Sequence, residues 1–136
     1  MPKVKLQDGS KGLVQSSGGG VFLDNNTQSL TAGAADAVTI SATGGSIVVV
    51  TSADANNIVH LPDCSDGDLI GQMFVIHVAA TGFELRGSAE ETQLLNGATG
   101  GAAVELAVPA FTALLAINVS ATLWALIGTG TPATAS

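Results

Sequence analysis

The chain has 136 residues and a net charge of −7, and 46% of its residues are hydrophobic whereas only 11% are charged. This length is sufficient for one domain with a real hydrophobic core. The shortage of charged residues argues against a helical bundle, because exposed helix faces normally carry Glu, Lys and Arg.

The first 35 residues differ from the rest in charge and composition. Three of the four basic residues, Lys3, Lys5 and Lys11, lie at this end, and the stretch is rich in Gly, Ser, Asn and Thr. It contains few large apolar side chains, so it can bury little surface to offset the entropy lost on ordering. We therefore expect an extended N-terminal arm over residues 1–35 that needs a partner, followed by a β domain over residues 36–136.

The charge distribution also limits the partners. Ten of the eleven acidic residues follow residue 11, and Arg86 is the only Lys or Arg in that part of the chain. Such an acidic body is repelled by phosphate backbones, so we expect no nucleic-acid binding. The N-terminus lacks the apolar core of a signal peptide, and the single cysteine, Cys64, cannot form an intrachain disulfide.

Short apolar runs with turn residues between them follow the arm. Gly, Asn, Asp or Pro stands at nearly every junction, and no helical period intervenes, apart from a helical turn expected near residues 88–93. Evenly spaced short strands predict an all-β fold, an antiparallel β-sandwich of jelly-roll type. The expected strands lie at 37–42, 46–52, 57–61, 72–80, 83–87, 92–97, 103–110, 114–119 and 123–128.

The densest group of chemically active residues lies within residues 60–80, namely His60, Asp63, Cys64, Asp66, Asp68 and His77. A calcium loop would need a distal bidentate Glu, and a zinc site would need more than one thiol or better spaced histidines. Glu90 and Glu91 are adjacent, so on a strand they point to opposite sides. We predict a turn here, with His60 as a locally hydrogen-bonded rim residue, and we expect neither a metal nor another cofactor nor a catalytic residue.

Residues 109–127 contain no charged side chain, and a stretch of this length could span a membrane. Pro109, the polar residues Asn118, Ser120 and Thr122, and flanks without Lys or Arg disfavour a spanning helix. Two alternating strands joined by a polar turn account for the same residues, so we predict a β-hairpin and no membrane contact.

The order of features from residue 57 to 128 resembles a module of tailed-bacteriophage structural proteins. The residues that carry the resemblance are Leu61-Pro62, the strand from Gly71 to Ile76, Asn96-Gly97, and Trp124 to Gly128. Capsid decoration (cement) proteins, head fibres and tail-fibre tips contain such modules. The closing turn departs from the pattern, because "SATLW" replaces the usual Asp-Gly or Asn before the Trp.

The resemblance implies a virion protein that decorates and cements the outside of a capsid, with the major capsid protein as its partner and a homotrimer as its form. A head-fibre or tail-fibre tip that binds a host receptor is the alternative. A polysaccharide-degrading enzyme is disfavoured, because one Trp and no Tyr supply little stacking surface. The expected capsid contacts lie in the arm: Lys3, Val4, Lys5, Leu6 and Lys11, with Val21, Phe22 and Leu23 as an apolar anchor.

Overall fold

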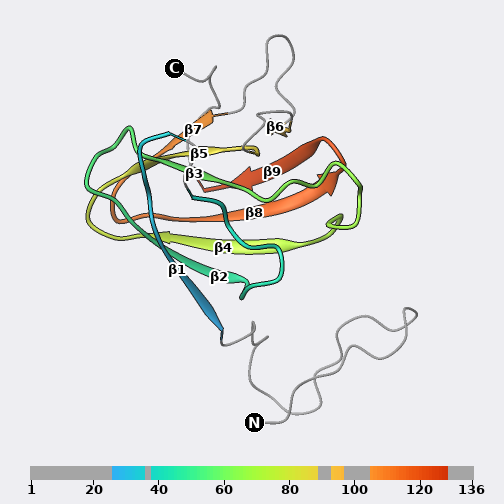
Figure 1. Cartoon of the computed structure of the whole chain (residues 1–136), viewed down its shortest axis with the longest axis horizontal. Coiled ribbons are helices and arrows are strands. Elements are labelled where there is room, and N and C mark those ends of the chain that lie inside the picture. Colours follow the sequence, from blue (N-terminus) through green and yellow to red (C-terminus); the bar gives the residue numbers. More distant parts are fainter. Residues whose placement is uncertain (1–25, 36–37, 89–92, 97–104, 129–136) are drawn as a thin grey trace.

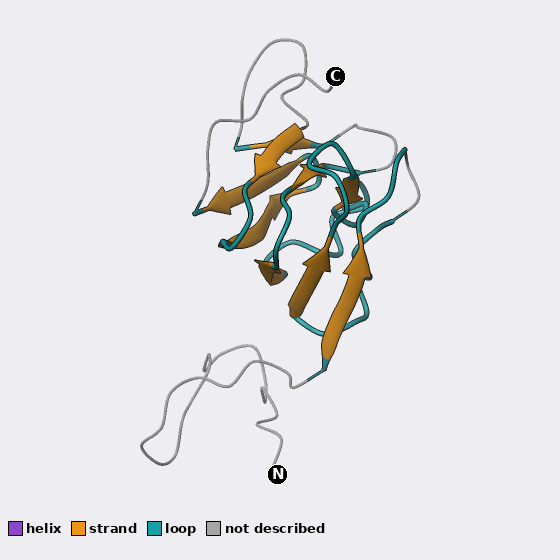
Figure 2. Cartoon of the chain, turned by 90° about the vertical axis from the view of Figure 1, so that its left-hand side faces the viewer, coloured by secondary structure: helices purple, strands orange, loops and turns teal. Residues whose placement is uncertain are grey.

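The computed structural model describes residues 26–35, 38–88, 93–96 and 105–128. These ranges contain nine strands and no helix (Figure 2). The strands are β1 (Thr27–Thr31), β2 (Ile47–Thr51), β3 (Ile58–His60), β4 (Met73–Val78), β5 (Phe83–Arg86), β6 (Leu94–Leu95), β7 (Glu105–Val108), β8 (Ala113–Ser120) and β9 (Leu123–Ile127).

The strands form two sheets, which Figure 1 shows with their labels. The larger sheet has six strands in the order β1-β2-β4-β8-β9-β6, and the smaller has three in the order β3-β5-β7. The prediction of an all-β, two-sheet fold is therefore confirmed. The pairing is mixed rather than antiparallel throughout, because the pairs β1–β2, β2–β4, β3–β5 and β6–β9 are parallel.

Two of the parallel pairs, β2–β4 and β3–β5, arise because the chain alternates between the sheets. Strands β2, β4, β6 and β8 belong to the larger sheet, and β3, β5 and β7, which lie between them in the sequence, belong to the smaller. The passage from β2 through β3 to β4 is one turn of a coil, so β2 and β4 lie side by side in the same direction, and so do β3 and β5. β8 and β9 follow one another within the larger sheet as the predicted antiparallel hairpin, whereas β1 and β2, also consecutive in that sheet, pair in parallel.

The core lies between the sheets and is made of alternate residues from both. Val48, Phe74 and Leu114 point inward from the larger sheet, and Val59 and Leu85 do so from the smaller. Burying such side chains is the main favourable term in folding. Trp124 is fully buried on β9, and its ring lies 5.9 Å from that of Phe74 between centroids, at an interplanar angle of 34°.

The N-terminal part of the body differs from the sequence-based boundaries. Residues 27–31, which the sequence predicts to be part of the arm, form β1 and pair in parallel with β2. The expected strand at 37–42 is reduced to a single bridge between Thr39 and His60. Gly45 allows the chain to pass close to the start of β1, because a Cβ there would overlap the backbone carbonyl of Asn26.

The β8–β9 hairpin occupies most of the uncharged stretch 109–127. Asn118 points inward and closes the turn, because its Nδ2 donates to the carbonyls of Ser120 at 2.9 Å and Leu123 at 3.2 Å. The register shifts between Asn118 and Ser120, where a bulge lies. Among the described residues there is no helix with the length and apolar character needed to cross a membrane.

Candidate functional site

The arm residues expected to contact a capsid lie outside the described residues. All eight, from Lys3 to Leu23, precede residue 26. Glu90 and Glu91 also lie outside, as does most of the helical turn expected near 88–93. The described part of the chain therefore bears on three other features: the group of polar residues within 60–80, a buried ion cluster, and the outer face of the larger sheet.

The two histidines of the 60–80 stretch do not meet. His60 ends β3 in the smaller sheet and is fully buried, whereas His77 lies on β4 in the larger sheet and is exposed. The prediction of a rim position for His60 was wrong, because β3 is not an outermost strand: residues 38–40 run beside it and bond to the His60 backbone. The backbone N–H of His60 donates to the carbonyl of Val38 at 2.9 Å, and its carbonyl accepts from Ile40 at 2.9 Å.

Cys64 is a buried thiol beside the core and not an activated nucleophile. Burial raises its pKa above the usual value, and contacts with Asn118 and Trp124 oppose that shift only in part. Its Sγ lies 3.5 Å from the carbonyl oxygen of Ser120. A reactive cysteine needs a lowered pKa and access to solvent, and Cys64 has neither.

The aspartates between β3 and β4 serve the turn that the sequence predicts there. Asp63 Oδ1 accepts from the backbone N–H of Ser65 at 2.9 Å and from Gln93 Nε2 at 2.8 Å. These bonds lower the pKa of Asp63. Asp66 Oδ1 likewise accepts from the N–H of Asp68 at 3.0 Å. Within the described ranges, no three His, Cys, Asp or Glu side chains are grouped so that they could hold a metal ion.

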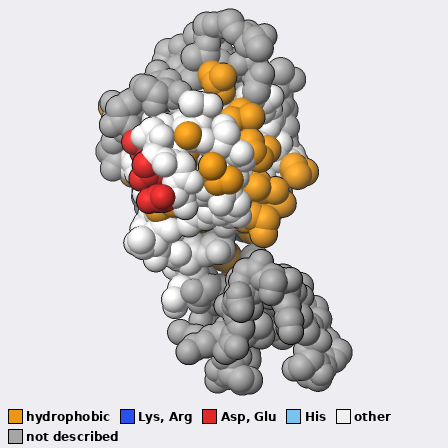
Figure 3. Space-filling view, turned by 90° about the vertical axis from the view of Figure 1, so that its right-hand side faces the viewer, with side chains coloured by type: hydrophobic (Ala, Val, Ile, Leu, Met, Phe, Trp, Pro, Cys, Tyr) orange, Lys and Arg blue, Asp and Glu red, His pale blue; other side chains and the backbone are white. Residues whose placement is uncertain are grey.

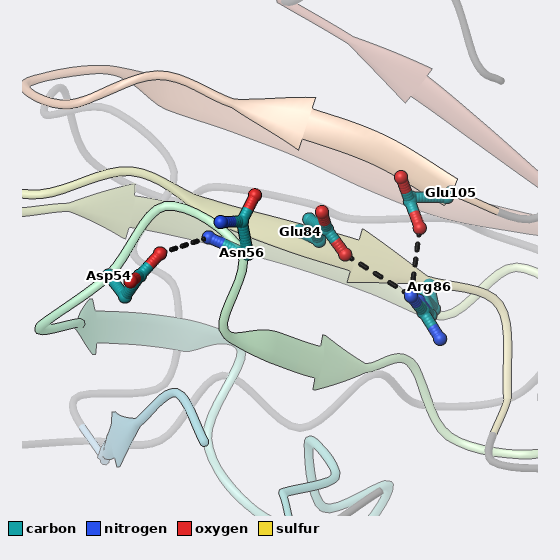
Figure 4. A network of polar contacts seen from close by, with 5 residues as sticks. All are labelled: Asp54, Asn56, Glu84, Arg86 and Glu105. Atoms are coloured by element: carbon teal, nitrogen blue, oxygen red, sulfur yellow. Dashed lines mark hydrogen bonds and ion pairs between the residues drawn. The ribbon is translucent and has the colours of Figure 1, made fainter. Parts of the chain in front are cut away.

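A buried ion cluster, absent from the sequence-based predictions, lies on the outer face of the smaller sheet (Figure 4). Glu84 and Arg86 are two residues apart on β5, so both side chains leave the same face, and Glu105 stands opposite Arg86 on β7. Arg86 Nη2 lies 3.2 Å from Glu84 Oε2 and 2.9 Å from Glu105 Oε2. The three residues are each only 8% exposed.

The cluster holds one positive charge between two carboxyl groups. Burial raises the pKa of Glu84, and the neighbouring Glu105 carboxylate adds to that rise, while Arg86 opposes it. Glu84 therefore takes up a proton more readily than an ordinary glutamate does. Because a lone buried charge is costly, both carboxyl groups depend on Arg86. The arrangement ties β5 to β7 in one register.

The outer face of the larger sheet is apolar over four adjacent strands. Burial alternates along β2, β4, β8 and β9, so the residues between the buried ones point away from the core. Apolar outward residues make up a surface that we call the outer apolar face: Ile47, Val49, Met73, Val75, Ala113, Leu115, Ile117, Val119, Leu123, Ala125 and Ile127. Several are well exposed, among them Met73 at 43%, Val119 at 45% and Ile127 at 60%.

Figure 3 shows apolar side chains gathered in a band along one side of the view, with Asp and Glu side chains along the other side. The polar outward residues of the same four strands are Thr51 and His77, together with Ser120 after the bulge. No Asp, Glu, Lys or Arg occurs among the residues of these strands. This part of the sheet has the composition of a contact surface rather than of a reaction site.

The ion cluster was not predicted from the sequence, but both it and the outer apolar face have sequence signals. The spacing of Glu84 and Arg86 suits two side chains on one face of a strand, and Arg86 is the only basic residue after residue 11. The long uncharged run at 109–127 signals a strand that is apolar on both faces.

The chain as a whole matches no family model, no curated protein and no solved structure.

Proposed function

We propose that this chain is a structural protein of a tailed bacteriophage that decorates the outside of the capsid and stabilises it by bridging capsomers as a homotrimer. The observation that carries the proposal is the outer apolar face, a broad uncharged surface on an all-β body. The charged side chains Glu84, Arg86 and Glu105 instead pair with one another. A contact function needs such a surface and no assembled reaction site. The partner is the major capsid protein, and the place of action is the capsid exterior of the virion.

The proposed mechanism is physical rather than chemical. Packaged DNA presses outward on the shell, and a decorating oligomer adds contact area that must be lost before neighbouring capsomers separate. Several weak contacts on one oligomer hold better than one, because a contact that detaches rebinds while the others remain in place. A compact β body joined to an N-terminal arm provides both a rigid spacer and a site of attachment.

The arm is the proposed capsid-binding element. Val21, Phe22 and Leu23 supply its apolar anchor, and Lys3, Lys5 and Lys11 supply attraction to an acidic shell surface that salt screens. The arm precedes β1, which is the edge strand of the larger sheet. Within the described part of the chain β1 ends the larger sheet, and strands from other chains often add at such an edge.

One observation favours the alternative, a head-fibre or tail-fibre tip. The parallel stacking of β1, β2 and β4 is a short coil, and such coils can be extended turn by turn into a shaft. A tip would bind a host surface receptor instead of the shell.

Imaging separates the two functions. Virions that carry this protein with an electron-dense label should show the label distributed over the shell by cryo-electron microscopy. Label confined to the tail, or to a single vertex, would move the fibre function ahead.

Substitutions in the arm test the contacts themselves. We expect the Phe22→Ser/Leu23→Ser variant to lower capsid occupancy more than Lys3→Ala/Lys5→Ala, because apolar contacts must offset the entropy of ordering the arm. The effect of the lysine variant should fade as salt is raised. Occupancy is measured by sedimenting capsids with the full-length chain. Equal occupancy for the intact chain and both variants would exclude the arm as the attachment site.

A further inference from the structure

We propose that the outer apolar face is the surface through which copies of this chain associate. The inference deepens the homotrimer of the proposed function, on which it rests for the oligomeric form, and it does not depend on the capsid. It assigns the contact to β2, β4, β8 and β9 and leaves the smaller sheet on the outside of the assembly.

The composition of the face is unusual for a surface in contact with water. A sheet with one solvated face normally alternates apolar residues inside with polar residues outside. On β8 the inward residues include Leu114 and Ala116, and the outward residues Leu115, Ile117 and Val119 are apolar as well. β8 therefore has the character of a strand covered on both sides, although within one chain the core covers only one.

The face has a boundary within the same sheet. The outward residues of β1 are Thr27, Ser29 and Thr31, and all three are exposed. The apolar surface thus ends at β2, and β1, which continues the sheet beyond it, presents polar side chains. A change from apolar to polar between adjacent strands is what distinguishes the centre of an interface from its rim.

The size of the face also suits a protein contact. Four strands at a spacing of about 4.8 Å and a length of about 16 Å give a flat area on the order of 300 Å². Apolar patches of this size on a single chain usually have a function. With a polar rim around it, the face is adequate for the centre of an interface that buries roughly 800 Å² per partner.

Charge identifies the occupant as a second copy. The chain carries a net charge of −7, so two copies repel each other wherever acidic surfaces meet. The strands of the outer apolar face contain no acidic or basic residue, so this contact brings no like charges together. A partner recognised by positive charge would instead find Asp63, Asp66 and Asp68 in the β3–β4 loop.

Sedimentation equilibrium of the full-length chain, without capsid, tests the inference. The intact chain should be oligomeric in the micromolar range. Ile117→Lys places a charge at the middle of the face and should weaken association by roughly 100-fold. Ser29→Lys places the same charge on the polar part of the same sheet, and we expect a change of less than about threefold there.

A second substitution guards against loss of folding. Leu115→Ser removes apolar surface without adding charge, and circular dichroism at low protein concentration shows whether each variant keeps the β fold. A folded variant with weakened association supports the inference. An intact chain that is monomeric throughout the micromolar range, or an Ile117→Lys variant that associates as well as the intact chain, would overturn it.

Capsid binding of the same variants separates this inference from the proposed function. If the intact chain is monomeric and Ile117→Lys abolishes capsid binding, the capsid covers the face, so the inference and the homotrimer fail while capsid decoration stands. If Ile117→Lys dissociates the oligomer while the intact chain binds no capsid, the inference stands and the function fails.

Discussion

The outer face of the smaller sheet carries charges that are buried, whereas the outer face of the larger sheet carries apolar side chains of which several are exposed. Glu84, Arg86 and Glu105 are each 8% exposed, while Ile127 on the larger sheet is 60% exposed. Each face thus reverses the usual relation between polarity and exposure. The smaller sheet satisfies its charges within the chain by pairing them. Among the described residues, none provides the apolar residues of the larger sheet with a comparable cover, and this difference is why we place the contact between copies there.

The largest effect that the comparison predicts is at Arg86. Replacing Arg86 by Met leaves two buried carboxyl groups without their cation, so we expect the free energy of unfolding to fall by about 3–5 kcal/mol. Urea unfolding at neutral pH measures the loss. The matched control replaces all three members together, Glu84→Leu/Arg86→Met/Glu105→Leu, and should recover most of the stability. A loss below about 1 kcal/mol for Arg86→Met would mean that the cluster is not closed from solvent.

Adjacent residues of β8 distinguish the two faces of the larger sheet. Leu114 is 3% exposed in the core, so Leu114→Ala should lower the free energy of unfolding by roughly 2–5 kcal/mol at every protein concentration. Leu115→Ala should cost less than about 1 kcal/mol in the dilute chain. Its main effect should be on association, so its loss of stability should grow with protein concentration. Identical, concentration-independent losses for both variants would contradict the assignment of the faces.

A smaller change, an increase in the free energy of unfolding, is expected on substitution of Glu84. Because the folded protein raises the pKa of Glu84, the unfolded chain releases this proton first as the pH rises. The stability due to protonated Glu84 is complete below the ordinary glutamate pKa and is lost as the pH rises through the raised, folded value. Glu84→Gln cannot ionise, so we expect it to stabilise the protein by about 1 kcal/mol at neutral pH.

The pH dependence provides the check on that substitution. The advantage of Glu84→Gln over the intact chain should shrink as the pH is lowered, because the intact chain then regains its proton. Thermal unfolding at several pH values measures it. An advantage that grows on acidification would show that the pKa is shifted in the other direction.

The positions of most strands could be predicted from the sequence, but their pairing could not. Alternation along residues 73–78 and 113–120 identifies strands whatever their neighbours are. The four residues between β4 and β5 are as short as a hairpin loop, yet they lead to the other sheet, so connection length alone does not separate a hairpin from a coil. Strand β1 was missed because Thr27–Thr31 has one large apolar residue, Leu30, and gains its place by pairing with β2.

The candidate surfaces show the same limit. The uncharged stretch indicates that β8 is apolar on both faces, but only the register with β4 and β9 shows which residues point outward. His60 and His77 are close in sequence and lie in different sheets, so their chemistry cannot combine. The Glu84 and Arg86 spacing predicts a shared face, whereas the approach of Glu105 depends on β7 pairing antiparallel to β5.

The most direct test compares one small residue on each outer face by thiol labelling. Ala125 lies on the outer apolar face, Ala107 is exposed on the outer face of the smaller sheet, and the native Cys64 is buried and should react slowly. We expect maleimide labelling of Ala125→Cys to slow as protein concentration rises through the micromolar range, while labelling of Ala107→Cys stays constant. Labelling of Ala125→Cys at one rate at every concentration would contradict the account, as would protection of Ala107→Cys instead.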